Sequence, residues 1–256
     1  MKFFTRYPTR CSKGKIFTMK LPEKLLTGTL IRRYKRFLAD VTLESGETIT
    51  IHCPNSGSMT GCDIPGSRVV LSRSDRPGRK YPHTWELVQV GGCWIGINTG
   101  ITPALVREAI TGGLVKELQG YETICPEVKR GDSRLDLLLT GECRPCWVEV
   151  KNVTLAENGL ALFPDAVTVR GQKHLTELMD VVRSGERGVI FYVVQRGDCR
   201  AMAPADRVDP RYGALLRESV AAGVEALAYR ADVSPGGIAL AERLPVELGT
   251  TVTGDK

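Results

Sequence analysis

The sequence predicts a two-domain protein of mixed α and β structure, in which a small β-barrel precedes a mixed sheet flanked by helices. The chain has 256 residues, which is long enough for two domains. Residues 25–100 read as short strands separated by turns, whereas residues 101–250 alternate strand-like runs with helical runs. We therefore expect a barrel over 25–100, an α/β domain over 101–250, an extension at 1–24 and a tail at 251–256.

The barrel is expected from a succession of short strand-like segments. The run from Leu25 to Leu43 and the segment "ETITIHC" flank the turn "ESGE", as the two strands of a hairpin would. The segments "SRVVLSRS", "TWELVQV" and "CWIGINT" follow, separated by loops that contain Gly or Pro. About five short strands within roughly 80 residues favour a small barrel, and an OB-type barrel is the leading interpretation.

The second domain begins with a short predicted helix, "PALVREAIT", in which Pro103 suits the first turn. Three strand-like segments follow: "YETICPEVK", "SRLDLLL" and "CWVEVKNVTL". The segment "VRGQKHLTELMDVVRSG" carries apolar residues at 175, 178, 179 and 182, which is helical spacing. A buried strand, "GVIFYVV", a helix, "PRYGALLRESVAAG", and a strand, "VEALAYRADV", complete an order that predicts helices covering a mixed sheet.

Composition limits the classes of protein to consider. Hydrophobic residues make up 42% and charged residues 25% of the chain, as in ordinary globular proteins. We see no apolar run long enough to cross a membrane and no secretory signal, so we expect a cytoplasmic protein without a membrane partner. The 8 cysteines are then expected to be reduced thiols.

Charge is unevenly distributed along the chain. Residues 1–100 hold 16 Lys and Arg against 7 Asp and Glu, whereas residues 101–256 hold 19 against 22. The basic half favours a polyanionic partner. Met19 is an alternative start, and without the 18 residues before it the net charge falls from +6 to +1. The argument for a polyanion therefore depends on local basic segments.

Three charged residues interrupt two strand-like runs of the second domain. Glu149 and Lys151 are two positions apart, so they face one side of a strand, while Val148 and Val150 face the other. The segment "TGECRPC" before them can reverse the chain and bring Asp136 beside Glu149. Two carboxylates and one ammonium group would then converge on one face of the sheet.

Such a cluster suits a divalent metal. Adjacent carboxylates repel unless a cation neutralises them, and Mg²⁺ or Mn²⁺ prefers oxygen ligands. Asp136 and Glu149 are therefore candidate metal ligands, and Lys151 is a candidate for positioning water or stabilising transition-state charge. An Asp followed by Glu-x-Lys is the pattern of PD-(D/E)xK phosphodiesterases. The alternative is a half-exposed strand with a Glu149–Lys151 ion pair worth about 0–1 kcal/mol.

Further candidates come from segments that are rich in cations. The helix that begins with "RGQKH" could bring auxiliary residues to the site: Arg170, Gln172 and Lys173. The segment "IRRYKRF" combines cations with aromatic rings, as nucleic-acid surfaces do, and gives the candidates Arg32, Arg33, Tyr34, Lys35 and Arg36. The loop "RPGRKYPHTW" adds Arg79, Lys80 and His83, and the strand of Asp136 adds Arg134. The alternative for "IRRYKRF" is a solvated basic strand.

Two other segments are weaker signals. The backbone N–H groups of "HCPNSGSMTGC" could form an anion cradle, although a structured loop between barrel strands is the better interpretation. Cys143 and Cys146 in "CRPC" have the spacing of a zinc or redox pair. A closed zinc site needs two further ligands, and no second pair has that spacing, so we expect no zinc.

Several long segments resemble one known family. The segments "RYKRFLADV", "HCPNSGSMTGC", "RKYPHTWELV", "EVKNVTLAEN" and "FPDAVTVRGQKHLTEL" are similar to those of the sugar fermentation stimulation protein A family of bacteria and archaea. The resemblance runs from about Leu25 to Leu248. It implies an OB-fold domain, a restriction-endonuclease-like domain, non-specific DNA binding and a regulatory role in sugar (maltose) metabolism.

The resemblance also carries site residues with it. The nuclease-like signature of the family falls on Asp136, Glu149 and Lys151, with Glu127 in "PEVK" as an extra carboxylate. The first hypothesis is therefore a non-specific, salt-sensitive DNA-binding protein with a nuclease-like metal site, and the alternative is an active Mg-dependent nuclease acting on DNA or RNA. The second hypothesis is a DNA-binding module that keeps the nuclease fold as a scaffold. The third is a purely structural role.

Overall fold

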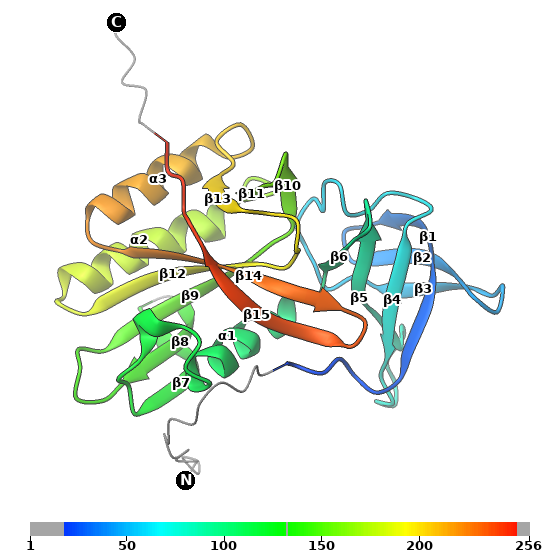
Figure 1. The fold of residues 1–256 in the computed structure, drawn as a ribbon, viewed down its shortest axis with the longest axis horizontal. Helices are drawn as coiled ribbons and strands as arrows, with labels where there is room; N and C mark the ends of the chain where they lie inside the picture. The colour runs from blue at the N-terminus through cyan, green and yellow to red at the C-terminus, as the bar shows by residue number, and fades with distance from the viewer. Residues whose placement is uncertain (1–17, 132, 250–256) are drawn as a thin grey trace, which may run out of the picture.

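The computed structural model of the protein describes residues 18–131 and 133–249, which form two domains (Figure 1). The N-terminal domain is a six-stranded sheet with the strand order β3-β2-β1-β4-β5-β6. Its strands are β1 Leu25–Tyr34, β2 Leu38–Leu43, β3 Thr48–His52, β4 Arg68–Arg73, β5 His83–Val90 and β6 Cys93–Gly96. A further pairing of β3 with β5, at His52 and Thr84, closes the sheet into the barrel that the sequence predicts.

Alternating apolar residues of these strands fill the barrel. Val41 on β2, Ile51 on β3 and Trp85 on β5 are completely buried in one cluster. Met59, from the loop between β3 and β4, joins the same cluster. The period of two along the strands therefore sorts the apolar residues inward and leaves the polar residues outside.

The run from Leu25 to Leu43 folds differently from the single long strand that was expected. It forms β1 and β2, which pair antiparallel up to Tyr34 and Leu38. Lys35 and Arg36 lie between them with φ angles of 48° and 63°. These two residues therefore occupy a hairpin turn and not a strand face, because a chain with left-handed backbone angles cannot continue an extended strand.

The second domain is built on a mixed sheet with the order β15-β14-β12-β9-β8-β7. Its strands are β7 Thr123–Arg130, β8 Ser133–Thr140, β9 Cys146–Val153, β12 Arg187–Val194, β14 Glu225–Ser234 and β15 Gly237–Leu244. The three central strands β9, β12 and β14 are parallel, and the outer pairs are antiparallel. This arrangement confirms the predicted mixed sheet.

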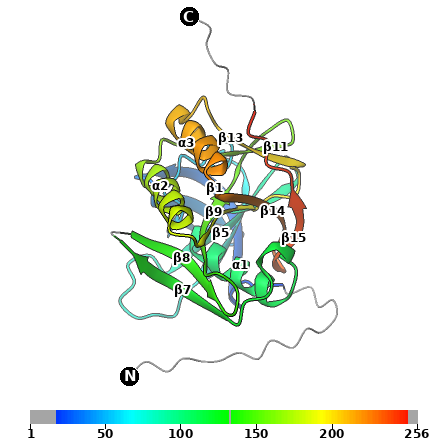
Figure 2. The same cartoon turned by 90° about the vertical axis from the view of Figure 1, so that its left-hand side faces the viewer.

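Helices cover both faces of this sheet (Figure 2). Helix α1, Thr102–Thr111, packs on one face, and helices α2, Val169–Arg183, and α3, Pro210–Ala221, pack on the other. Thr168 caps α2 by accepting a hydrogen bond from Gly171 N, and Asp209 caps α3 by accepting one from Tyr212 N. The helices therefore begin where a side chain satisfies a free backbone N–H.

Several short elements were not expected from the sequence. A small sheet contains β10 Leu155–Glu157, β11 Leu160–Phe163 and β13 Ala201–Pro204, and two 3₁₀ turns are η1 Thr99–Ile101 and η2 Lys116–Leu118. Strand β15, which pairs with β14, was also missed. Within the described ranges, no helix is both long enough and apolar enough to span a membrane.

The two domains meet along an extended contact. Gly96 N at the end of β6 donates a hydrogen bond to Gln195 O, directly after β12. A side chain at Gly96 would collide with that of Gln195, so the glycine permits this close approach. Part of the predicted extension also belongs to the second domain, because Met19 pairs with Ile238 and Leu21 is buried in the core beneath α1. The predicted tail and residues 1–17 lie outside the described residues.

Candidate metal and nucleic-acid site

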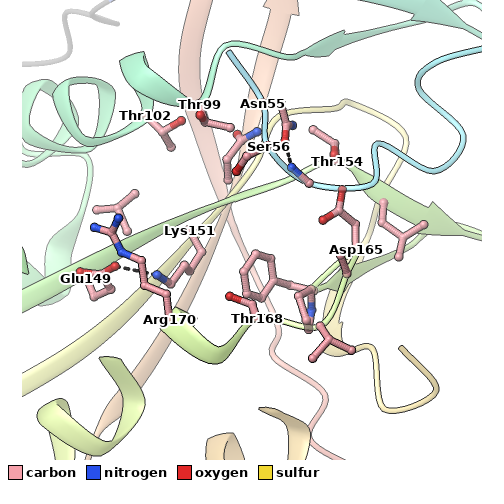
Figure 3. Close-up of a pocket in the computed structure, with 18 of the residues that line it drawn as sticks. Asn55, Ser56, Thr99, Thr102, Glu149, Lys151, Thr154, Asp165, Thr168 and Arg170 are labelled. Carbon is pink, nitrogen blue, oxygen red and sulfur yellow. Dashed lines mark hydrogen bonds and ion pairs between the residues drawn. The ribbon is translucent and has the colours of Figure 1, made fainter. Parts of the chain in front are cut away.

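A cavity of about 530 Å³ lies between the two domains and contains the charged residues singled out in the sequence (Figure 3). The barrel contributes the turn after β1 and the loop after β3. The second domain contributes β8, β9, the small sheet and the start of α2. Its lining includes Arg36, Asn55, Asp136, Glu149, Lys151 and Arg170.

Asp136 and Glu149 lie side by side on neighbouring strands. The antiparallel ladder of β8 and β9 ends with the pair Leu137 and Val148, and Asp136 and Glu149 are the next residues beyond it, close enough for the Glu149 charge to act on Asp136. Asp136 Oδ2 accepts a hydrogen bond of 2.8 Å from Val150 N. The predicted approach of the two carboxylates is therefore present, and the hydrogen bond from Val150 N holds the Asp136 side chain against β9.

A lysine and a histidine contact the same oxygen of Glu149. Lys151 Nζ lies 2.6 Å from Glu149 Oε1, and His174 Nδ1 on α2 also hydrogen-bonds to that oxygen. Arg170 Nε lies 3.4 Å from His174 Nε2. Because the Glu149 carboxylate can only accept, Nδ1 is the donor to it, and Nε2 is left to accept from Arg170. The imidazole is thereby oriented from both sides.

The two carboxyl groups have opposite proton affinities. Burial, followed by the nearby Glu149 charge, raises the pKa of Asp136 to about 6. Burial also acts to raise the pKa of Glu149, but Lys151 and His174 outweigh it and hold that pKa below its ordinary value. Glu149 therefore loses its proton at lower pH than Asp136 does, and a nearby cation would help Asp136 to ionise as well.

The residues present fit a divalent cation that completes its coordination with water or a phosphate oxygen. Glu149 is only 3% exposed, and its Oε2 atom has no hydrogen-bond partner among the described residues. A buried carboxylate oxygen without a donor is costly unless a cation faces it. Within the described part of the chain, no three His, Cys, Asp or Glu side chains gather as a ready-made metal cage. Mg²⁺ is commonly bound by one or two carboxylates, while water or phosphate oxygens fill the rest of its coordination sphere, and Asp136 and Glu149 suit that pattern.

A loop of the barrel forms the opposite wall of the cavity. The Arg33 guanidinium donates to the carbonyls of Arg36, Asn55, Gly57 and Ser58, with distances of 2.8–3.0 Å. Arg33 therefore holds this loop together from behind. We expected Arg33 to contact nucleic acid, but this geometry favours a structural role.

The same loop is tied to the second domain by one aspartate. Asp165, between β11 and α2, accepts a hydrogen bond of 2.9 Å from Met59 N through Oδ2. Ser58 Oγ hydrogen-bonds to the Asp165 carbonyl. The loop that was considered as an anion cradle is therefore a structured loop, and it lines the cavity through Asn55 and its neighbours.

The remaining candidates on "IRRYKRF" lie in two environments. The Arg32 guanidinium sits 5.0 Å from the centre of the Tyr34 ring, and both side chains hydrogen-bond to Asp40 on the outside of the barrel. Lys35 and Arg36 are exposed in the hairpin turn, and Arg36 lines the cavity. Arg36 is thus the residue of this segment that the fold brings to the charged cluster.

The other predicted contacts lie outside the cavity lining. Arg79 Nη2 donates to Thr84 Oγ1, Lys80 lies over the Tyr81 ring, and His83 begins β5. The exposed side chain of Arg134 on β8 lies 3.9 Å from Glu127. Their role in nucleic-acid binding stays a prediction.

Of the predicted auxiliary residues, some line the cavity and others do not. Glu127 falls opposite Asp136 in the register of β7 and β8 but is exposed. Gln172 Nε2 donates to both oxygens of Asp209, and Lys173 pairs with Glu177, so neither lines the cavity. Arg170 does line it. Residues 170 and 174 are one turn apart and share a helix face, whereas Gln172 reaches Asp209.

His174 is the site residue that our selection from the sequence omitted. It lies on α2 one position before Leu175, on the helix side that packs against the sheet, and it is buried. A histidine one turn after Arg170 and next to the apolar stripe could have been picked out, because a buried titratable residue needs a polar partner.

A closed OB-type barrel followed by a restriction-endonuclease-like sheet, with an acid–lysine cluster at their junction, defines the class of protein to which this chain is similar. Residues 31–97 match the model of the SfsA N-terminal OB domain, and residues 100–237 match the sugar fermentation stimulation protein RE domain. The chain belongs to the sugar fermentation stimulation protein family.

Similar proteins extend over most of the chain. Sugar fermentation stimulation protein homologs from Pelobacter propionicus and Geobacter metallireducens are each 66% identical, and the matches cover 90% of this chain and 100% of each relative. The solved structure of Pyrococcus furiosus SfsA in complex with Ca²⁺ is 28% identical, with a TM-score of 0.83 over 90% of this chain and 99% of that one. The predicted family and its two-domain fold are thus confirmed.

Proposed function

We propose that the protein is a non-specific DNA-binding protein with a divalent-metal site in its nuclease-like domain, acting as a regulator of sugar (maltose) metabolism. The observation that carries the metal site is the buried Glu149 Oε2, which has no partner among the described residues and lies beside Asp136. The relative from Pyrococcus furiosus was solved with Ca²⁺, a cation that shares oxygen ligands with Mg²⁺. The names of the relatives support the link to sugar fermentation.

DNA is the proposed partner because cations border the cavity and the barrel. Arg36 lines the cavity at the barrel turn. Arg170, at the start of α2, lies near Lys151 of β9 in the wall formed by the second domain (Figure 3). Contacts of this kind bind phosphates without reading bases. We expect the affinity to fall steeply as salt rises from about 50 to 200 mM, and we expect no membrane partner.

A second candidate function is an active metal-dependent nuclease, which the position of Lys151 favours. Asp136 and Glu149 would hold Mg²⁺ or Mn²⁺, which supplies Lewis-acid stabilisation of a phosphoryl oxygen when bound. Lys151 Nζ sits at the edge of the carboxylate pair, where it can orient a water or neutralise developing charge. His174 and Arg170 keep Glu149 oriented for this task.

One experiment separates the two functions. Labelled single-stranded and duplex DNA are incubated with Mn²⁺ and either the wild-type protein or Glu149→Ala, at concentrations that give equal binding. Metal-dependent cleavage that is lost in the variant identifies a nuclease. Binding without cleavage by either protein identifies a binding protein on a nuclease scaffold, and absence of binding at low salt contradicts the proposal.

A further inference from the structure

We propose that the cavity between the domains receives an unpaired nucleic-acid strand, and not an intact duplex, with Phe37 stacking on one of its bases. This inference rests on the proposed function, because it names the class of nucleic acid that the site of Asp136 and Glu149 receives. It follows from the size of the cavity, from its fixed walls and from the apolar residues at its rim.

The cavity has the volume of a small-ligand site. It measures about 530 Å³, within the range of about 300–1,000 Å³ that such sites span. A nucleotide-sized group fits a space of this size, and enzymes that act on a base take its nucleotide out of the stack to place it in such a pocket. We therefore expect the strand whose phosphodiester reaches Glu149 and Lys151 to be unpaired there.

The walls of the cavity are held at a fixed separation. On the barrel side, Met59 N and Ser58 Oγ both bind Asp165 of the second domain. Away from this loop, Gly96 N donates to Gln195 O across the same junction. Widening the cavity to admit a duplex would break these contacts together, so the structure favours a slender ligand.

The hairpin turn beside the cavity presents an aromatic ring to solvent. Phe37 is 49% exposed and directly follows Arg36, which lines the cavity. Lys35 and Arg36 occupy the left-handed region, which residues other than glycine rarely adopt, and such backbone strain is concentrated at functional sites. An exposed ring next to two cations is the arrangement that stacks a base while holding the adjacent phosphates.

The opposite rim of the cavity is also apolar. Val167 and Val169 both line it and are 68% and 74% exposed. They flank Thr168, across the cavity from Asn55 and Ser56 (Figure 3). Exposed valines contribute nothing to phosphate binding, whereas apolar side chains pack against a base that has left the stack. The rim therefore suits bases, and the charged interior suits the phosphodiester.

The test compares a labelled single strand with a blunt duplex of the same sequence, by fluorescence anisotropy in the presence of Ca²⁺ at low salt. We expect the wild type to bind the single strand at least about tenfold more tightly than the duplex. Phe37→Ala should weaken single-strand binding about tenfold, the usual scale for loss of one stacked base, and Phe37→Trp should retain it. Ile64→Ala is the matched control, because Ile64 is 48% exposed but, unlike Phe37, has no cavity-lining residue next to it in the chain.

The outcomes distinguish this inference from the proposed function. Equal or tighter binding of the duplex, with Phe37→Ala behaving like Ile64→Ala, overturns the single-strand inference while DNA binding stands. Failure of the wild type to bind either form overturns the proposed function and this inference with it. A double variant, Val167→Ser with Val169→Ser, tests the other rim, and loss of single-strand affinity without a change in Tm supports the inference.

Discussion

Lys151 Nζ contacts Glu149 Oε1 at 2.6 Å, and the two residues lie two positions apart on one face of β9. The two oxygens of the Glu149 carboxylate therefore have different environments. Oε1 is neutralised by Lys151 and hydrogen-bonded by His174, whereas Oε2 stays buried without a partner among the described residues. The Glu149 side chain is therefore fixed and ionised, with one oxygen available for a cation.

Replacement of this carboxylate should remove metal binding. We expect wild-type protein to bind Mn²⁺ saturably, and we expect Glu149→Gln to weaken binding at least about tenfold, because an amide neither carries the charge nor replaces an oxygen pair. Isothermal titration calorimetry measures both. Glu218→Gln is the control, since Glu218 is exposed on α3 and outside the cavity lining. Equal affinity of wild type and Glu149→Gln would contradict the metal assignment.

Asp136 should make the stability of the metal-free protein depend on pH. Its pKa is about 6 in the folded protein and about 4 in an unfolded chain. Between these values the folded state holds a proton that the unfolded state has lost, so the free energy of unfolding falls as pH rises through this window. The side chain of Asp136→Asn cannot ionise, so the free energy of unfolding of this variant should exceed that of the wild type by about 1–3 kcal/mol at pH 7.5.

Urea unfolding in the presence of a chelator measures this difference at two pH values. At about pH 4 both forms are neutral, so the variant and the wild type should unfold at similar urea concentrations. A variant that is less stable than wild type at both pH values would show that ionisation of Asp136 does not destabilise the folded protein.

His174 should act as a positioning residue for Glu149. His174→Leu removes the donor to Glu149 Oε1 and should weaken Mn²⁺ binding about 10–100-fold, as loss of an outer partner of a metal ligand does. His174→Asn can present an N–H near the position of Nδ1 and should recover part of that affinity. A residue that only fills space would give the opposite order, because leucine preserves apolar volume better than asparagine. Thr176→Ala, on the exposed side of α2, is the control.

Arg36→Gly should raise the stability of the protein but lower its affinity for nucleic acid. Glycine relieves the left-handed backbone at this position and should raise the free energy of unfolding by about 1 kcal/mol, or Tm by about 2–4 °C. The same change removes a cation from the cavity lining and should weaken DNA binding. Thermal unfolding and anisotropy on the same samples measure both effects. A rise in Tm with unchanged affinity would exclude Arg36 from the binding surface.

Features that depend on local periodicity could be predicted from the sequence. Alternation along β9 placed Glu149 and Lys151 on one face, and the turn before it placed Asp136 beside them. The turn at Lys35 and Arg36 was not foreseen, because neither residue is a glycine or an asparagine that marks left-handed backbone. Short elements such as β10 were missed, since three residues carry too little pattern.

Features that depend on the assembly of two domains could not be predicted. Nothing in the local sequence indicates that the loop at Asn55 lies against a cavity that also contains Glu149, because the contact joins residues about a hundred positions apart. Arg33 likewise belongs to a basic segment, and only the fold shows that backbone carbonyls occupy its guanidinium. Long-range packing decides such roles.

The bridge from Asp165 to Ser58 and Met59 also bears on how sequences of this family can change. Each wall of the cavity is encoded in a different part of the chain, so a substitution in one wall alters the fit of the other. A chimaera that joins the barrel of one relative to the sheet domain of another would need matched loops at this junction, even if both halves fold. The unit that must be inherited together is therefore the junction between the domains.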